Sequence, residues 1–332
     1  MRYLVTGGGG FIGRAIIDEI YRQDSRAEVV SFQRSDHPDL REKGVEVVCG
    51  GLTDLEAVSQ VTENVDVIFH TAAKAGIWGD WETFYQPNVI GTRNILYGCK
   101  HSRVRALVYT SSPSVVFGGE PIQGGDENLP YPESWPFFYG HTKALAEQSI
   151  LEAHNPQGTD LRTIALRPHL VWGKGDPHIA PRIIAQAKAG KLKQVGDGSN
   201  RVDMTHVRNV ASAHWKALES LQGEGTGGKA YFISDDAPVK LWEWAGELLD
   251  KTDSPPIRSK VSLKTALRIG GILEWAYRTF PLKGEPPLTR FVALQMAEDH
   301  WFDISAAKKE LGYEPMVDRE AAMEELATSL KE

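Results

Sequence analysis

Short apolar runs alternate with longer segments of helical hydrophobic spacing through the first half of the chain. This alternation is typical of a parallel sheet with helices on both faces, because both sides of each strand are buried. The expected strands are Arg2–Thr6, Glu28–Phe32, Val45–Cys49, Val65–His70, Arg105–Ser111 and Leu161–Arg167. The expected helices are Phe11–Arg22, Asp54–Glu63, Trp81–Cys99 and Phe138–Ala153. We therefore predict an α/β fold with a doubly wound parallel sheet.

The pattern changes after about Gly173, where helical spacing dominates and connections rich in Gly and Pro, such as GKGDP and KGEPP, interrupt it. A late strand at Lys229–Ser234 is expected to return to the first sheet. We expect a sheet domain at residues 1–172 and a smaller, helix-rich lobe at 173–332, with 203–234 returning to the sheet domain. Such a lobe is an appendage rather than an independently folding domain.

Composition and charge narrow the range of partners. The 332 residues are 41% hydrophobic and 24% charged, which is ordinary for a globular chain, and the formal net charge is −7. No basic surface is expected for nucleic acid or an anionic membrane, so a small molecule is the expected partner. The longest apolar segment, Leu263–Leu282, is interrupted by charged residues, so no membrane span is predicted.

The two cysteines, Cys49 and Cys99, lack the spacing of a metal site or a redox motif. Both are interpreted as buried thiols in a reducing compartment. This interpretation favours a cytoplasmic protein with no bound metal. The chain starts on strand residues instead of a charged and then apolar leader, so no targeting segment is predicted.

The segment TGGGGFIG follows the first expected strand and opens the first expected helix. Gly7 suits a tight turn, Gly10 lets the backbone approach a pyrophosphate, and Gly13 allows close packing of helix on sheet. Together with Phe11 and Ile12, these glycines form a candidate dinucleotide site. A flexible loop without a ligand is the alternative interpretation.

The residues after the second expected strand bear on the choice of cofactor. NAD sites usually have an acidic residue about twenty positions after the glycine loop, where it binds the ribose hydroxyls. This chain has Gln33 and Arg34 there, which favours the 2′-phosphate of NADP(H). NAD(H) stays open, because Asp36 is close by and Arg34 also suits a solvated loop.

Tyr139 and Lys143 form a YxxxK pair at i and i+4, which places the phenol and the ammonium on one helix face. A lysine there is expected to lower the proton affinity of the phenol. A solvated helix face is the alternative interpretation. Ser111 and Ser112 end an expected strand, where an α/β sheet places ligand-binding groups.

Six segments resemble motifs of the extended short-chain dehydrogenases: TGGGGFIG, HTAA at 70–73, NVIGT at 88–92, YTSS at 109–112, YGHTK at 139–143 and LRPHLVWGKGD at 166–176. The resemblance covers nearly the whole chain. It implies a Rossmann domain at 1–172 and a substrate-binding lobe. It implies that Tyr139 is the general acid/base, that Lys143 holds the nicotinamide ribose and tunes Tyr139, and that Ser112 binds the substrate oxygen.

The resemblance also implies further cofactor contacts from Leu52, Ala72, Ala73, Asn88, Ser111 and Pro168. Some of these residues have purely structural alternatives. Asn88 suits a helix cap, and the two alanines suit close packing at a strand end. This chain departs from the family at Gly51, where an Asp usually precedes the adenine-contacting residue, which leaves the role of Leu52 open. His169 follows Pro168 and suits either a proton relay or a buried, hydrogen-bonded histidine.

Within this superfamily the chain most resembles the 3-beta-hydroxysteroid dehydrogenase branch, and KAGIWGDW at 74–81 resembles bacterial reductases of 2-alkyl-3-oxoalkanoates in olefin biosynthesis. The resemblance implies interconversion of a 3-oxo group and a secondary alcohol on a large apolar substrate. Alternatives are a 3-beta-hydroxysteroid or sterol-4-carboxylate 3-dehydrogenase, a nucleotide-sugar epimerase or dehydratase, and a non-catalytic NAD(P)-binding regulator. A homodimer through Trp81–Cys99 and Phe138–Ala153 is also implied.

Two apolar segments are candidates for the wall of the substrate pocket. Leu263–Leu282 and the run from Phe291 to Met296 have more apolar surface than a sugar pocket needs. A core-packed amphipathic helix is the alternative for the first segment. Trp78 and Trp81 are expected to add aromatic surface near the nicotinamide, with structural packing as the alternative.

Overall fold

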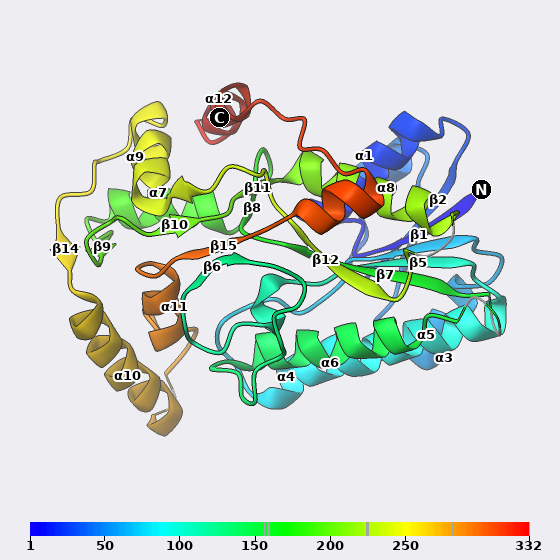
Figure 1. Ribbon diagram of the computed structural model, residues 1–332, viewed down its shortest axis with the longest axis horizontal. Coiled ribbons are helices and arrows are strands. Elements are labelled where there is room, and N and C mark those ends of the chain that lie inside the picture. The colour runs from blue at the N-terminus through cyan, green and yellow to red at the C-terminus, as the bar shows by residue number, and fades with distance from the viewer. Residues whose placement is uncertain (156, 158–159, 224–225, 281, 332) are drawn as a thin grey trace.

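A seven-stranded parallel sheet forms the centre of the computed structural model, which describes residues 1–155, 157, 160–223, 226–280 and 282–331 (Figure 1). Its strands, in spatial order, are β3 (Glu46–Cys49), β2 (Glu28–Gln33), β1 (Arg2–Thr6), β4 (Val67–His70), β5 (Ala106–Thr110), β7 (Arg162–Pro168) and β12 (Lys229–Ile233). From β1 the chain first adds β2 and β3 on one side and then adds β4, β5, β7 and β12 on the other side. The direction in which strands are added therefore reverses between β1 and β4. Ligands of such sheets bind at this reversal. The predicted α/β fold is confirmed.

Helices cover both faces of this sheet (Figure 1). On one face α1 (Phe11–Gln23) packs against α8 (Val207–Leu221). On the other lie α3 (Leu55–Val61), α5 (Gly91–Ser102) and α6 (Phe138–Glu152), while the short α2 (Pro38–Glu42) precedes β3. The apolar spacing of α1 explains its orientation, because Ile16, Ile17 and Ile20 are buried on one side.

The helix predicted at Trp81–Cys99 is interrupted. It consists of α4 (Trp81–Tyr85), a π-helical turn at Gln86–Ile90, and then α5. Pro87 lies inside the turn and cannot donate a backbone hydrogen bond, which favours a local departure from α-helical pairing. Single π-turns inside helices are frequent at functional sites, and this one contains Asn88.

The smaller lobe contains a four-stranded sheet in the order β13 (Val239–Lys240), β10 (Arg201–Val202), β15 (His300–Phe302) and β6 (Ile122–Gly125). Two further sheets pair β8 (Val171–Trp172) with β11 (Thr205–His206) and β9 (Gln194–Val195) with β14 (Lys260–Val261). Its helices are α7 (Ile179–Lys188), α9 (Leu241–Lys251), α10 (Leu263–Thr279), α11 (Arg290–Gln295) and α12 (Arg319–Ser329). Short turns complete the elements, a 3-10 turn at Pro113–Val115 and a π-turn at Ala307–Leu311. Since β6 belongs to the first half of the chain, β15 brings residues near 300 beside the sheet domain.

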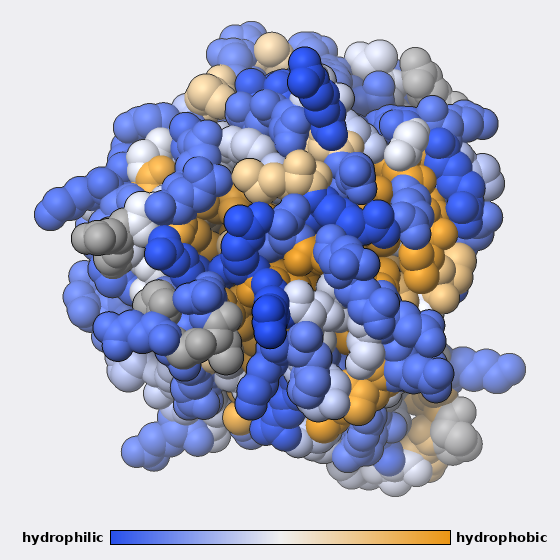
Figure 2. Space-filling view, turned by 90° about the vertical axis from the view of Figure 1, so that its right-hand side faces the viewer, coloured by the Kyte–Doolittle hydropathy of each residue, from blue (hydrophilic) through white to orange (hydrophobic). Residues whose placement is uncertain are grey.

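The prediction that both thiols are buried is wrong for Cys49. Cys99 is buried in α5, whereas Cys49 is exposed because it is the last residue of β3, the edge strand of the large sheet. The side of the molecule that carries the N-terminus presents mainly hydrophilic residues, with hydrophobic ones between them (Figure 2). No helix among the described residues has the length and apolar content needed to span a bilayer.

Candidate active site

The glycine loop turns tightly at the end of β1. Gly7 has a φ of +71°, and its N–H donates to the Phe32 carbonyl over 2.8 Å. A Cβ at Gly13 would lie 2.2 Å from the Gly7 oxygen, so a side chain at either glycine is incompatible with this turn. α1 begins at Phe11, and the backbone N–H groups of its first turn have no helical partners. These groups and the helix dipole suit a phosphate.

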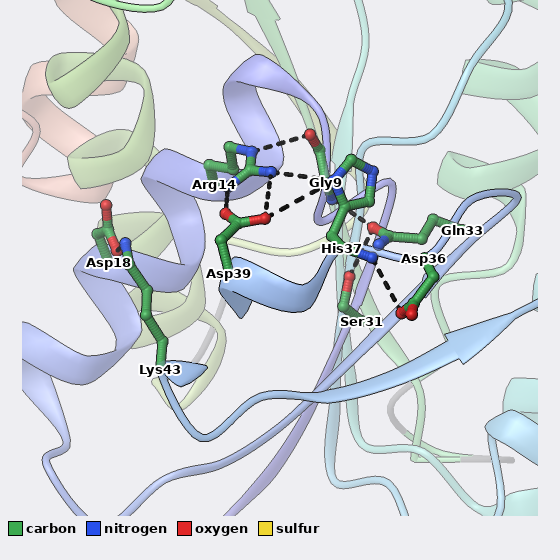
Figure 3. A network of polar contacts seen from close by, with 9 residues as sticks. All are labelled: Gly9, Arg14, Asp18, Ser31, Gln33, Asp36, His37, Asp39 and Lys43. Carbon is green, nitrogen blue, oxygen red and sulfur yellow. Dashed lines mark hydrogen bonds and ion pairs between the residues drawn. The ribbon is translucent and has the colours of Figure 1, made fainter. Parts of the chain in front are cut away.

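Gln33 folds back onto the glycine loop, as Figure 3 shows. Its Oε1 accepts from the Gly9 N–H and, over 2.8 Å, from the Ser31 hydroxyl. Arg14, on the first turns of α1, donates to the Gly9 carbonyl over 3.0 Å and is paired with Asp39 (Figure 3). Gln33 is therefore fixed against the loop, while Arg34 beside it is exposed.

The residues around this loop fit a dinucleotide. Gln33 Nε2 and Ser111 Oγ are buried polar atoms without a partner in the described chain, which a bound ligand would satisfy. A Cβ on Gly7 would lie 3.0 Å from the Ala72 Cα, so the turn after β4 lies directly beside the loop. Ala72 is half-buried there and Ala73 is exposed. Small residues from both turns therefore lie next to the N-terminus of α1.

Ser112 and Tyr139 come from different elements and meet at one cavity. Ser112 follows β5 and accepts from the Ser114 N–H and hydroxyl over 3.2 and 2.9 Å. Tyr139 lies in the first turn of α6. Burial raises the pKa of the Tyr139 phenol, and a hydrogen bond with Ser112 opposes that rise. The phenol is therefore protonated at neutral pH and can donate to an oxygen beside Ser112.

Lys143 is buried one turn after Tyr139, and its ammonium points at the sheet. Its Nζ donates to the Thr110 carbonyl over 2.6 Å and lies 4.0 Å above the Tyr109 ring. Burial lowers the pKa of Lys143 to about 7, against a rise caused by Glu147. In this arrangement the Lys143 ammonium is held against the carboxyl end of β5.

A buried ion pair lies one further turn along α6. Arg167 Nε and Nη2 donate to the two oxygens of Glu147 over 3.0 and 2.6 Å, and the Tyr131 hydroxyl donates to the same carboxylate over 2.6 Å. Glu147 is fully buried and Arg167 is 4% exposed. This pair fixes α6 against β7 and supplies the charge that favours protonated Lys143.

Asn88 does not cap a helix in this structure. Its Oδ1 accepts from the Lys74 N–H over 2.7 Å, and its Nδ2 donates to the Lys74 carbonyl and the Thr142 hydroxyl over 3.1 Å each. Asn88 therefore joins the segment after β4 to α6 beside Lys143. Leu52 packs on Gly91 at the start of α5 and its carbonyl accepts from Asn94, which is a structural contact.

A cavity of about 210 Å³ opens beside Ser112, Tyr139 and Pro168. Its far wall is aromatic, with the rings of Phe137 and Phe291 centred 3.8 Å apart. The other lining residues are Gly76, Ile77, Pro113, Ser114, Phe117, Ile122, His169, Leu170, Gln295, His300 and Phe302. No Lys, Arg, Asp or Glu from the described part of the chain lines it. This apolar cavity with a hydroxyl pair suits a neutral or hydrocarbon-rich substrate.

Of the two segments expected to form the wall of the substrate pocket, only one lines the cavity. Phe291 of α11 lines the cavity, but no residue of α10 does, and Trp275 is 61% exposed. Trp78 packs against Tyr277 of α10, and Trp81 packs between Tyr85 and Phe138. Neither tryptophan lines the cavity. The reason is that α11, not α10, fills the layer next to Phe137, and α10 packs outside it.

Several polar residues of the site had no sequence-based assignment, among them Arg14, His37, Gln295 and His300. Arg14 directly follows Gly13, and His37 contacts it over 3.0 Å, so their position next to the glycine motif was the available signal. His300 and Gln295 enter from the lobe, more than a hundred residues from Tyr139, where no local pattern marks them.

Comparison with known proteins agrees with this geometry. A model of the 3-beta hydroxysteroid dehydrogenase/isomerase family matches residues 4–264. The chain belongs to this family. A 2-alkyl-3-oxoalkanoate reductase of Stenotrophomonas maltophilia is 42% identical over 99% of both chains. The human decarboxylating sterol-4-alpha-carboxylate 3-dehydrogenase is 32% identical over 99% of this chain and 88% of its own.

Solved structures of other proteins share the fold of this chain. Gox2253 has a TM-score of 0.77 at 26% identity, over 99% of this chain and 97% of its own. The UDP-glucuronic acid 4-epimerase of Bacillus cereus, solved with NAD, has a TM-score of 0.77 at 21% identity over 100% and 99% of the two chains. The predicted extended short-chain dehydrogenase fold is confirmed, and the chain is a nicotinamide-dependent oxidoreductase acting between hydroxyl and oxo groups.

Proposed function

We propose that the chain interconverts the 3-oxo group of a 2-alkyl-3-oxoalkanoate and the corresponding secondary alcohol. The observation that carries this proposal is the cavity, in which Ser112 and Tyr139 face the aromatic wall formed by Phe117, Phe137 and Phe291. Such a wall binds alkyl chains through burial, at roughly 25 cal/mol per Å². The 42% identity to two reductases named for this substrate supports the same class.

The alternatives have less support. A nucleotide sugar carries a charged diphosphate, for which Arg is a frequent partner, and the described lining of the cavity has neither Arg nor Lys. The sterol dehydrogenase relatives are less similar, at 32% identity for the human protein. A regulator without turnover has no need of the set Ser112, Tyr139 and Lys143, which this chain retains.

The proposed roles follow from where each side chain lies. A bound nicotinamide cofactor supplies or accepts the hydride. Ser112 donates a hydrogen bond to the ketone oxygen, and Tyr139 transfers its phenolic proton to that oxygen as negative charge develops. The raised pKa of Tyr139 keeps this proton in place at neutral pH. Lys143, one turn further along α6, would hold the nicotinamide ribose of a bound cofactor and would supply positive charge next to the phenol.

We propose that the cofactor contacts the glycine loop at Gly7 and Gly10–Gly13, and also Ala72, Ala73 and Pro168. Leu52 would lie toward the adenine, and Asn88 would support the segment beside the site. Ser111 Oγ would gain a hydrogen-bond partner when the cofactor binds. NADP(H) is proposed over NAD(H), because Gln33 is neutral and two cations lie near it, Arg14 on the Gly9 carbonyl and Arg34 next in the chain. Asp39 offsets the charge of Arg14, whereas Arg34 has no ion pair with any residue that the structure describes.

A homodimer and a cytoplasmic location are proposed on narrower grounds. Tyr97 on α5 and Phe138 on α6 are 46% and 43% exposed, and the expected dimer face contains both helices. Cys49 and Cys99 are both free, which is compatible with a reducing compartment.

The test uses stable 3-hydroxy acids with NADP⁺, since 3-oxo acids lose carbon dioxide. kcat/KM should rise with the length of the alkyl chain. Phe291→Ser should raise KM for long substrates more than for short ones, because Phe291 lines the cavity. Phe280→Ser is the matched control, since Phe280 is 51% exposed outside the cavity. Efficient turnover of a nucleotide sugar, with all long 3-hydroxy acids and 3-hydroxysteroids inert, would show that this substrate class is wrong.

A further inference from the structure

The helix α10 has a buried side and an unusually apolar exposed side. Ala266, Gly270 and Glu274, at i, i+4 and i+8, are its buried residues, and Gly270 and Glu274 face the start of α11. Ile269, Ile272 and Trp275, at i, i+3 and i+6, lie on the other side and are 43%, 64% and 61% exposed. The helix is therefore fixed to the lobe by one face only.

This exposed apolar surface is concentrated rather than scattered. Ten large hydrophobic residues are exposed in the described part of the chain, and five of them lie between residues 269 and 282. The other two of the five, Phe280 and Leu282, are 51% and 50% exposed, and the Phe280 ring packs edge-on against Trp275. Single exposed apolar residues are common, but a cluster of this kind marks an interaction surface.

The charge around α10 has the opposite sign to the chain as a whole. The segment 258–283 contains six basic residues and one acidic residue, in a protein of formal net charge −7. That acidic residue, Glu274, is buried and paired with Arg290 over 2.8 Å. The basic residues are all exposed: Arg258, Lys260, Lys264, Arg268, Arg278 and Lys283.

A helix with Trp and Ile on one side, a Phe directly after its end and flanking Lys and Arg is an arrangement that suits the interface of an anionic bilayer. We propose that residues 258–283 dock the protein onto an anionic membrane surface, with Trp275 and Ile272 entering the boundary of the acyl chains. A second copy of this chain suits the surface less well. Two identical faces, each with six basic residues, would repel each other across a two-fold axis.

The docking helix adjoins the cavity. Tyr277 and Arg278 of α10 contact the Trp78 ring, at 6.2 and 5.6 Å, and Gly76 and Ile77 just before it line the cavity. α10 also packs on α11, which contributes Phe291 to the cavity wall. If the proposed function holds, the site lies close to the bilayer in which a long alkyl substrate is dissolved. The docking itself rests only on the apolar cluster and its charge.

The test is cosedimentation of the full chain with vesicles of phosphatidylcholine alone or mixed with phosphatidylglycerol. We expect binding to the mixed vesicles only, weakened by salt. Ile272→Ser with Trp275→Ser, and separately Lys264→Gln with Arg268→Gln, should each reduce the bound fraction at least tenfold. Leu55→Ser is the matched control, because Leu55 is 43% exposed on α3, away from α10.

Turnover of a short, water-soluble substrate without vesicles should be unchanged in both double variants, which shows that they fold. Equal binding to neutral vesicles, or equal loss of binding in Leu55→Ser, would overturn the proposal. A change in the molecular mass of Ile272→Ser with Trp275→Ser in lipid-free solution would assign the surface to a second copy instead. Vesicle binding by a protein inert toward 3-hydroxy acids would reject the proposed function and leave the docking surface standing.

Discussion

His169 Nε2 lies 2.6 Å from His300 Nδ1, although 131 residues separate the two side chains in the sequence. His300 Nε2 faces the Gln295 carbonyl at 2.8 Å, and a carbonyl can only accept. His300 Nε2 therefore carries its proton, His300 Nδ1 accepts, and His169 Nε2 donates. Burial lowers the pKa of both imidazoles, so the pair is neutral, and His169, which lines the cavity, keeps Nδ1 as an acceptor.

This arrangement predicts that carboxylate substrates bind together with a proton. Only a protonated His169 can donate from Nδ1 to a carboxylate, and burial holds the pKa of His169 well below its usual range, so KM for a 3-hydroxy acid should rise with pH already from the acidic end of the measured range. The methyl ester of the same acid should show a flat KM, since an ester carries no charge to pair. Steady-state kinetics from pH 5.5 to 8.5 measure both, and parallel profiles for acid and ester would contradict the prediction.

A second histidine predicts a pH dependence of stability. Burial lowers the pKa of His214 to about 4, while the Thr110 hydroxyl lies 2.7 Å from its Nε2 and Nδ1 faces the Val210 carbonyl. Between pH 6.5 and about 4, His214 is protonated in the unfolded chain but remains neutral in the folded chain. Stability is therefore lost as the pH falls from about 6.5 toward 4, by up to about 1.4 kcal/mol per pH unit.

Measuring this effect requires a variant, because other buried groups titrate in the same range. His214→Gln keeps a donor and an acceptor but cannot be protonated. Urea unfolding at pH 7.5 to 5 should show the wild type losing free energy of unfolding relative to the variant as pH falls. The exposed His101→Gln is the control. A difference that stays constant with pH would refute the prediction.

Local patterns predicted the parts of the site that lie within one element. The glycine turn and the Tyr139–Lys143 spacing depend on a few consecutive residues, and the structure has both where they were expected. The contact of His169 with His300 requires β15 to pair with β6 and β10, which no local pattern specifies. Hydrophobic periodicity likewise predicts that α10 is amphipathic, but not that α11 separates it from the cavity.

Tyr139→Phe should abolish turnover and leave cofactor binding nearly intact. The ring still packs against the Phe137 ring, which is centred 6.4 Å away, but the phenolic proton is lost. General acid/base groups usually contribute about 10²- to 10⁴-fold. A fall in kcat below about tenfold, with cofactor fluorescence titration unchanged, would exclude Tyr139 as the proton donor.

Gln33→Asp should shift cofactor preference from NADP(H) toward NAD(H). A carboxylate at this position repels a 2′-phosphate and accepts from ribose hydroxyls. The comparison is the ratio of kcat/KM for the two cofactors, with Arg34→Gln as a second variant that should weaken NADP(H) alone. Equal use of both cofactors by the wild type would refute the preference.

Glu147→Gln should have two effects at once: it should destabilise the fold, and it should shift the pH profile of turnover. Removing the carboxylate leaves the Arg167 charge buried and unpaired, which costs about 3–5 kcal/mol. The exposed pair of Arg2 with Glu46 gives the matched control, since Glu46→Gln should cost about 0–1 kcal/mol. Glu147 also raises the pKa of Lys143, so its loss should lower that pKa from about 7 and move the alkaline limb of kcat to lower pH. If Glu147→Gln loses stability but the alkaline limb of kcat stays at the same pH, the protonation of Lys143 does not limit turnover.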